Sequence, residues 1–361
     1  MAKIAIFLTA LDGGGAERVM LNLARGFTDG GWDVDLLLVQ AEGAYISQIP
    51  PQVKVVNLNK PRLLLSIPAL ITYLQTEQPT ALLAALDTNL VSVWGRKLAK
   101  VSTQVIVTVH NVLSQECAQS KQLKRRLTPQ LAKTFYPWAD VVVAVSQGVK
   151  DDLVNLGLPA HQIQVIYNPI VTPELRAQIP DTTVHPWFAT GQPPVILGVG
   201  RLTPQKDFST LIRAFAQVRQ QKSVRLMILG EGEERSSLES LSQQLGVAED
   251  VALPGFVSNP HVFMAQATML VLSSAWEGFG NVLVEAMAMA TPVVSTNCKS
   301  GPGEILADGK YGKLVPVGDK NSMAQAIVNT LASTADADLL QKRAWEFSLE
   351  TAVMQYESLF N

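Results

Sequence analysis

The chain has 361 residues, of which 47% are hydrophobic and 17% are charged, so it can bury the cores of about two domains. Its formal net charge of −2 gives no reason to expect a nucleic acid as the main partner. The two cysteines lack metal-ligand spacing, and no apolar run approaches the ~20 residues that span a bilayer. The N-terminus also lacks the flanks of a signal peptide. These features predict a cytoplasmic protein that at most rests on a membrane surface.

Short apolar strands alternate with amphipathic helical segments, which predicts parallel sheets with helices on both faces. The expected strands are residues 4–8, 35–39, 82–86, 104–109 and 141–145, followed by 195–199, 225–229, 251–253, 269–272 and 292–295. The proline-rich stretch 171–194 predicts a linker between two doubly wound, Rossmann-like α/β domains, residues 1–170 and 195–343. Residues 344–361 have helical apolar spacing. Two such domains facing across a cleft would bind a ligand at the carboxyl ends of their strands.

A glycine loop at residues 12–15 follows the first expected strand and precedes a helical pattern. Glycines let the backbone approach a ligand and present amides at a helix N-terminus. The alternative, a dinucleotide fingerprint, requires glycine or alanine where Arg18 stands. We therefore favour a phosphate- or acceptor-facing loop, in which Gly14 and Gly15 contact the ligand.

Two acid-x-acid pairs, Asp33 with Asp35 and Asp336 with Asp338, are candidate metal ligands. Neither pair has a histidine or further carboxylates close in sequence, so we interpret all four as surface residues. The sequence predicts no metal and no other cofactor.

His110 ends the expected strand 104–109, at the carboxyl edge of the first sheet. Its imidazole could donate to a sugar hydroxyl, or it could cap the next segment. Further along, no acid occurs between Cys117 and Ala139, while four of the basic residues there are Lys121, Lys124, Arg125 and Arg126. This segment predicts either a patch for anionic lipid or the acceptor, or a solvated helix face.

Two cations follow the first strand of the second domain, Arg201 and Lys206. A departing diphosphate gains negative charge as its bond to a sugar breaks, so fixed cations there stabilise the transition state more than the ground state. The alternative is two solvated surface charges.

Two carboxylates, Glu277 and Glu285, lie eight residues apart across a glycine-containing loop. The expected strand 269–272 leads into this loop and an apolar helical segment leads out of it. Amides of residues 278–281 at the helix N-terminus are donors for an anion or for hydroxyls. The alternative is a helix N-terminus with acidic first-turn residues. Acceptors, donors and cations at one edge suit a sugar attached to a diphosphate.

With these motifs the chain resembles the retaining glycosyltransferases of family 4, which have the GT-B fold. The resemblance covers nearly the whole length, and its most specific part is the acid-x7-acid motif from Glu277 to Glu285. The resemblance implies that Glu277 and His110 contact the donor sugar, that Glu285 holds the ribose hydroxyls, and that Arg201 and Lys206 grip the diphosphate. It also implies donor contacts from Gly14, Gly15 and the backbone of Phe279, Gly280 and Asn281, and a C-terminal helix, residues 344–361, that packs back on the first domain.

The loop 298–306 resembles that of bacterial enzymes that extend lipid-linked or capsular glycans, some with N-acetylhexosamine donors. The expected activity is therefore retaining transfer of a sugar from a nucleotide diphosphate sugar, UDP-linked, to a glycan or lipid-linked acceptor. A sugar-nucleotide hydrolase or epimerase on the same fold, and a non-catalytic glycan-binding protein, are the alternatives. A glycoside hydrolase using the two carboxylates would leave the cations and the glycine loop without a role.

Overall fold

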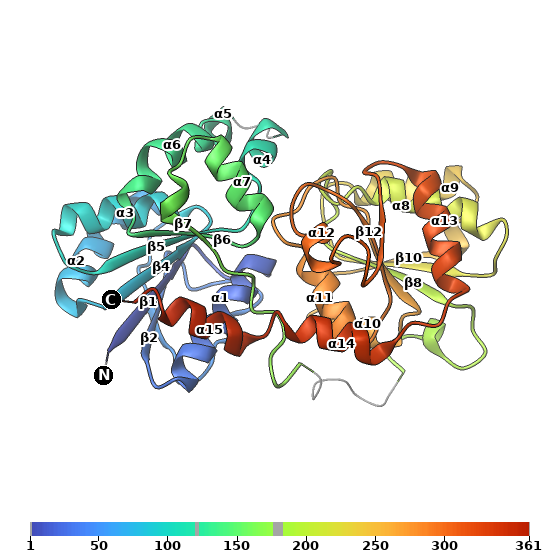
Figure 1. The fold of residues 1–361 in the computed structure, drawn as a ribbon, viewed down its shortest axis with the longest axis horizontal. Helices are drawn as coiled ribbons and strands as arrows, with labels where there is room; N and C mark the ends of the chain where they lie inside the picture. Colours follow the sequence, from blue (N-terminus) through green and yellow to red (C-terminus); the bar gives the residue numbers. More distant parts are fainter. Residues whose placement is uncertain (1, 120–122, 176–182, 361) are drawn as a thin grey trace. The chain divides into compact units, whose positions relative to one another are not determined.

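The computed structural model describes residues 2–119, 123–175 and 183–360 and divides into two compact units. The first unit contains residues 1–170 and 348–361, and the second contains residues 171–347. Each unit is a parallel sheet with helices on both sides (Figure 1). The chain passes between the units at residues 170–171 and again at residues 347–348.

The first sheet has the strand order β3-β2-β1-β4-β5-β6-β7. Its inner strands are apolar on both faces, as expected for a parallel sheet covered by helices. The strands are β1 (Lys3–Leu8), β2 (Asp33–Leu38), β3 (Lys54–Asn57), β4 (Ala81–Ala85), β5 (Gln104–Val109), β6 (Val141–Ala144) and β7 (Ile163–Val165). The helices are α1 (Gly15–Asp29), α2 (Ile67–Glu77), α3 (Thr88–Ala99), α4 (Leu113–Gln119), α5 (Leu123–Arg126), α6 (Thr128–Phe135) and α7 (Gln147–Asn155), with α15 (Leu349–Glu357) from the C-terminus.

The second sheet has the strand order β10-β9-β8-β11-β12-β13. Its strands are β8 (Val195–Val199), β9 (Arg225–Leu229), β10 (Val251–Gly255), β11 (Met269–Leu272), β12 (Val293–Thr296) and β13 (Lys313–Val315). Its helices are α8 (Phe208–Arg219), α9 (Arg235–Gln244), α10 (His261–Gln266), α11 (Asn281–Ala288), α12 (Pro302–Ile305), α13 (Lys320–Leu331) and α14 (Ala337–Trp345). Phe208, Phe215 and Leu226 belong to the buried core that joins α8 to this sheet.

The ten strands expected from the sequence are all present, and the structure adds β3, β7 and β13, all of them three or four residues long. The C-terminal helix expected at residues 344–361 is shorter in the structure: α15 spans Leu349–Glu357, and residues 344 and 345 end the preceding helix α14. Helix α15 packs on α1 within the first unit: Trp32 donates to Glu357 at 2.8 Å, and a Cβ on Gly26 would lie 2.5 Å from Val353. Among the described residues, no helix combines the length and apolar character needed to cross a membrane.

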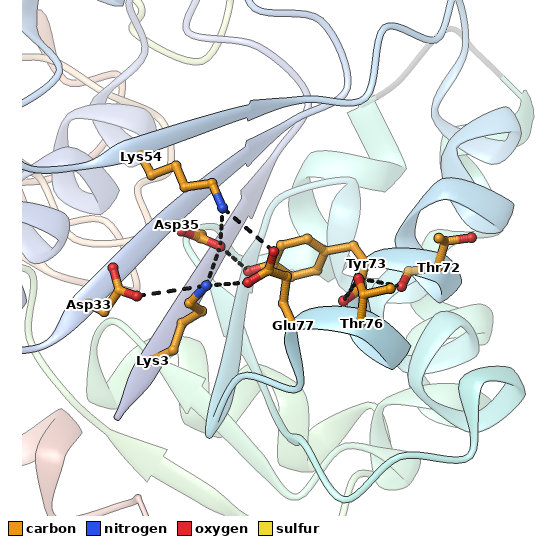
Figure 2. A network of polar contacts seen from close by, with 8 residues as sticks. All are labelled: Lys3, Asp33, Asp35, Lys54, Thr72, Tyr73, Thr76 and Glu77. Atoms are coloured by element: carbon orange, nitrogen blue, oxygen red, sulfur yellow. Dashed lines mark hydrogen bonds and ion pairs between the residues drawn. The ribbon is translucent and has the colours of Figure 1, made fainter. Parts of the chain in front are cut away.

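A charged network ties β1, β2, β3 and α2 together at the amino edge of the first sheet (Figure 2). Lys3 and Lys54 lie 3.3 and 3.9 Å from the Asp35 carboxylate, and the Tyr73 hydroxyl donates to it at 2.7 Å. Lys3 also pairs with Glu77; burial lowers the pKa of Lys3, but its contacts with Glu77 and Asp35 together outweigh burial and raise it. The prediction that Asp35 lies on the surface is therefore wrong: its side chain is completely buried, whereas the Asp33 side chain is 49% exposed.

We expect Asp35→Asn to destabilise the protein by about 2–4 kcal/mol, because it leaves a largely buried ammonium without its central partner. Chemical denaturation followed by circular dichroism measures the loss. The matched control is Asp33→Asn, whose exposed carboxylate should contribute less than about 1 kcal/mol. Equal effects of the two substitutions would show that burial of Asp35 does not matter.

Candidate active site

Strands β8 and β11 are neighbours at the centre of the second sheet, and the chain runs outward from them in opposite directions. Such a point, where strand order reverses, opens a crevice beyond the carboxyl ends of the strands and is where open α/β sheets bind ligands. The loop after β8 carries Arg201 and Lys206, and the loop after β11 carries Glu277. The sheet topology therefore brings Glu277 to the loop that carries Arg201 and Lys206, although more than 70 positions of sequence separate Glu277 from either cation.

Hydrogen bonds fix these two loops to each other. Ser273 donates to the Lys206 carbonyl at 2.7 Å, and the Ala275 amide donates to the Gln205 carbonyl at 2.8 Å. The Gln205 side chain donates in turn to the Trp276 carbonyl at 3.1 Å. Lys206 and Glu277 are consequently placed by a rigid frame rather than by long free loops.

Lys206 and Glu277 form the central ion pair of the site, with Nζ 2.5 Å from Oε1. Ser274 donates to the same carboxylate oxygen at 2.5 Å. The Glu277 side chain is 8% exposed and the Lys206 side chain 16%, so the pair is largely shielded from solvent. A buried carboxylate requires such partners, because its desolvation is otherwise unfavourable.

Arg201 lies on the same loop as Lys206, but its side chain is exposed. Among the described residues its guanidinium makes no hydrogen bond and no ion pair. The loop therefore offers one cation that is already paired and one that is not.

A third loop, after β12, supports the glycine loop that precedes α11. Ser300 donates to the Gly278 carbonyl at 2.7 Å, and a Cβ on Gly301 would lie 1.7 Å from the Phe279 carbonyl oxygen. Gly301 also has φ +85°, so this close approach requires glycine. Gly280, with φ +102°, is the N-cap of α11, and Asn281 is the first residue of that helix.

The Phe279 side chain is 2% exposed and packs on Phe347, with ring centroids 5.3 Å apart. The side chain of Phe279 is therefore not available to a ligand. Cys298 is buried, and burial together with the charge of Glu277 raises its pKa to about 12. A thiol with that pKa stays protonated and is a poor nucleophile.

Glu285 lies in α11 and faces His261, the first residue of α10, with Oε2 3.9 Å from Nε2. Both side chains are about 15% exposed, at 14% and 15%. Among the described residues, His261 Nδ1 is buried without a hydrogen-bond partner. His261 was not among the predicted site residues; its only signal in the sequence was a histidine after β10, at the same edge as Glu277.

The glycine loop of the first unit also follows a strand at a reversal of strand order, because β1 lies between β2 and β4. The amides of Gly13 and Gly14 donate to the Glu17 carboxylate at 2.8 and 3.1 Å, while Gly15 begins α1. A ligand that bound the Gly14 amide would have to displace Glu17. The glutamate three residues after Gly14 was a visible capping signal in the sequence.

His110 follows β5 at the same edge of the first sheet. Its Nε2 lies 3.1 Å from the Thr108 hydroxyl, and its Nδ1 is buried and lacks a hydrogen-bond partner among the described residues. Burial lowers the pKa of His110 to about 4, so its ring is neutral at neutral pH. A neutral imidazole offers one donor and one acceptor to a hydroxyl.

The predicted basic patch is only partly described. Lys121 and the side chain of Lys124 lie outside the part of the chain that the structure describes. Arg125 is 53% exposed and pairs with Glu116 at 3.4 Å, and Arg126 is exposed. In the part of the chain that the structure describes, no group of three or more His, Cys, Asp or Glu residues is arranged to hold a metal ion.

Family models match both units. The model described as Glycosyltransferase Family 4 matches residues 13–173, and the model described as Glycosyl transferases group 1 matches residues 184–346. The chain is also 30% identical over 346 residues to a Campylobacter jejuni N-acetylgalactosaminyltransferase, with 92% of this chain and 90% of that enzyme covered. The chain belongs to glycosyltransferase family 4.

Further similarities are to another glycosyltransferase sequence and to solved structures of the same fold. The chain is 34% identical over 223 residues to the lipopolysaccharide core biosynthesis glycosyltransferase LpsE of Rhizobium meliloti, which covers 62% of each chain. The structure of Anabaena HepE in complex with UDP and glucose superposes with a TM-score of 0.80 at 23% identity, with 99% of both chains covered. The apo form of the lipopolysaccharide outer core galactosyltransferase WaaB gives a TM-score of 0.74 at 22% identity over 99% of both chains. Two Rossmann-like units of this kind are the GT-B fold, and the protein is a glycosyltransferase.

Proposed function

We propose that this glycosyltransferase moves a sugar from a UDP-linked donor, an N-acetylhexosamine, to a lipid-linked glycan with retention of anomeric configuration. The observation that carries the proposal is the shielded Lys206–Glu277 pair beside the exposed Arg201, at the strand-order reversal of the second sheet. One carboxylate for sugar hydroxyls and two cations for a diphosphate are the groups that a nucleotide sugar requires. No metal and no other cofactor is part of the proposal.

Each residue has a distinct role in this proposal. Arg201 and Lys206 neutralise the diphosphate as it departs, and Glu277 accepts hydrogen bonds from the sugar hydroxyls. Glu285 binds the ribose hydroxyls. The backbone at residues 279–281 faces the sugar or phosphate, where the N-terminus of α11 favours negative charge. His110 and the glycine loop of the first unit contribute sugar and phosphate contacts.

The transfer proceeds on one face of the sugar. The bond between the anomeric carbon and the phosphate oxygen breaks, and its electron pair passes to the diphosphate. The acceptor oxygen bonds to the same face of the carbon, and its proton passes to the departing phosphate. This route suits a site whose nearby thiol, Cys298, is kept protonated and cannot serve as a nucleophile.

The relatives support the choice of donor and acceptor. The Campylobacter enzyme is, by its name, an N-acetylgalactosaminyltransferase acting on a diphospho-undecaprenol-linked saccharide. LpsE is named for lipopolysaccharide core biosynthesis, and HepE was solved with UDP, with UDP and glucose, and with UDP-glucose. A lipid-linked acceptor also requires peripheral contact with a membrane, which we include in the proposal.

The test is incubation of the protein with UDP-N-acetylglucosamine or UDP-N-acetylgalactosamine, with and without a polyprenyl-diphosphate-linked N-acetylhexosamine. We expect UDP release to depend on the acceptor, and proton NMR of the product to show the α configuration of the donor. UDP release at full rate without acceptor would instead indicate a sugar-nucleotide hydrolase. An altered sugar on the nucleotide would indicate an epimerase.

His261 is expected to orient Glu285 toward the ribose, so His261→Ala should weaken UDP binding about fivefold, the effect of losing one polar partner of the carboxylate. Calorimetry with UDP and with 2′,3′-dideoxy-UDP measures this effect, and the loss should vanish with the dideoxy compound. His161→Ala, an exposed histidine of the first unit, is the matched control. An equal loss with both nucleotides would show that His261 does not act through Glu285.

A further inference from the structure

Two consecutive leucines of the first unit are unusually exposed. Leu64 is 62% and Leu65 53% exposed, and both lie in the single 3-10 turn η2 (Leu63–Ser66) that precedes α2. The Leu65 amide donates to the Arg62 carbonyl at 3.0 Å, and the buried Ser66 donates to the Leu63 carbonyl at 2.6 Å. The turn therefore holds both leucines outward in a fixed conformation. Single exposed leucines are ordinary, but an ordered adjacent pair suggests a contact surface.

The sequence on either side of these leucines carries charge of one sign. Residues 43–76 contain no aspartate or glutamate, whereas they contain Lys54, Lys60 and Arg62. Lys54 is engaged with Asp35 and Glu77 at the amino edge of the sheet. Arg62 is exposed and Lys60 half-buried, and neither forms an ion pair with any described residue. These two cations are therefore available to an anionic partner.

Backbone hydrogen bonds place this segment at the carboxyl edge of the first sheet. The amides of Leu58 and Lys60 donate to the carbonyls of Leu38 and Val39, at 2.8 and 3.0 Å, beyond the end of β2. The Val39 and Gln40 amides continue the same pattern to the end of β1, where the glycine loop begins. The exposed leucines therefore belong to the edge that carries the glycine loop and His110, and not to the opposite edge with the Asp35 network.

We propose that residues 60–66, the leucine turn, dock on an anionic lipid surface through Leu64, Leu65, Lys60 and Arg62. Aliphatic side chains that enter the acyl boundary beside basic groups at the headgroup level are the pattern of an interfacial contact. A nucleic acid would call for exposed aromatic side chains for stacking, and the turn has none. This proposal rests on the proposed function, because it assumes a lipid-linked acceptor. Docking through the leucine turn would bring the carboxyl edge of the first sheet, with its glycine loop and His110, to the membrane that holds this acceptor.

The leucine turn differs from the predicted basic segment in how its described cations are paired. Arg125 of the basic segment pairs with Glu116, whereas Lys60 and Arg62 of the leucine turn form no ion pair with any described residue. The two surfaces are separable by mutation, because they come from different loops of the same unit.

The test is co-sedimentation of the full chain with phosphatidylcholine vesicles, with and without phosphatidylglycerol. We expect binding that is stronger with phosphatidylglycerol and weaker at high salt. Lys60→Gln with Arg62→Gln should lower that binding about fivefold per residue. Leu64→Ser with Leu65→Ser should lower it at least tenfold, whereas the matched control Leu98→Ser, a 60% exposed leucine on α3, should not.

Three results would overturn the proposal. They are no sedimentation of the wild type with phosphatidylglycerol vesicles, equal sedimentation of the leucine variant and the wild type, and a loss caused instead by Arg125→Gln with Arg126→Gln. A fall in the molar mass of the leucine variant from dimer to monomer would assign the turn to self-association and would overturn it as well. Vesicle binding needs no donor, so failure here is distinct from failure of the proposed transferase activity.

Discussion

Lys206→Ala should lower kcat about 100- to 1000-fold while changing the dissociation constant of the nucleotide sugar by less than about tenfold. The ammonium is held 2.5 Å from Glu277 in a shielded position, so it meets the diphosphate with little reorganisation. Its attraction to that group grows as the bond to the sugar breaks and charge accumulates on the leaving oxygen, which confines most of its effect to the transition state.

Steady-state kinetics and calorimetry on the same preparation separate the two quantities. Lys299→Ala is the matched control, because Lys299 is an exposed lysine on the neighbouring loop after β12. Since the substitution leaves Glu277 with fewer partners, a thermal melt must accompany the kinetics. Turnover equal to wild type in a folded Lys206→Ala protein would refute the leaving-group role.

Glu277→Gln should lower kcat/KM about 100- to 10,000-fold, because it replaces a charged acceptor of sugar hydroxyls with a neutral amide and leaves Lys206 without its partner. The side chain keeps its size, and the Ser274 hydroxyl can still donate to the amide oxygen, so the loop should retain its conformation. The loss therefore reports the carboxylate's charge rather than a collapse of the loop.

A series of monodeoxy donor sugars identifies what Glu277 binds. The penalty of Glu277→Gln should nearly disappear for the donor that lacks the bound hydroxyl and persist for the others. Glu239→Gln, on the exposed face of α9, is the control. If the penalty is the same for every deoxy donor, Glu277 does not contact the sugar.

Much of the second unit could be predicted because its signals are local. The strand 269–272, the glycine-containing loop and the apolar helix that contains Glu285 are contiguous in sequence, and each part favours the same structure. The Lys206–Glu277 contact, in contrast, has no local signal in the sequence. Both residues were expected at a carboxyl edge, but only the adjacency of β8 and β11 brings them together.

The errors have physical reasons. β3 was missed because it has only four residues, Lys54–Asn57, at the sheet edge, and its two adjacent valines give no alternating apolar pattern. Asp35 looked like a surface acid, yet Tyr73, 38 positions later, covers and bonds it. His261 became a candidate only when α10 was seen beside Glu285. Burial of a polar side chain by a distant element leaves no local signal.

Calorimetric titration of the wild type and of Glu285→Ala with UDP-, GDP- and ADP-sugars tests the central claim most directly. We expect micromolar binding of UDP-sugars in preference to the other two classes, weakened about 10- to 100-fold in the variant by loss of charged hydrogen bonds to the ribose. Absence of binding to all three classes, or equal binding by the two proteins, would contradict the assignment of the β8–β11 crevice as the donor site.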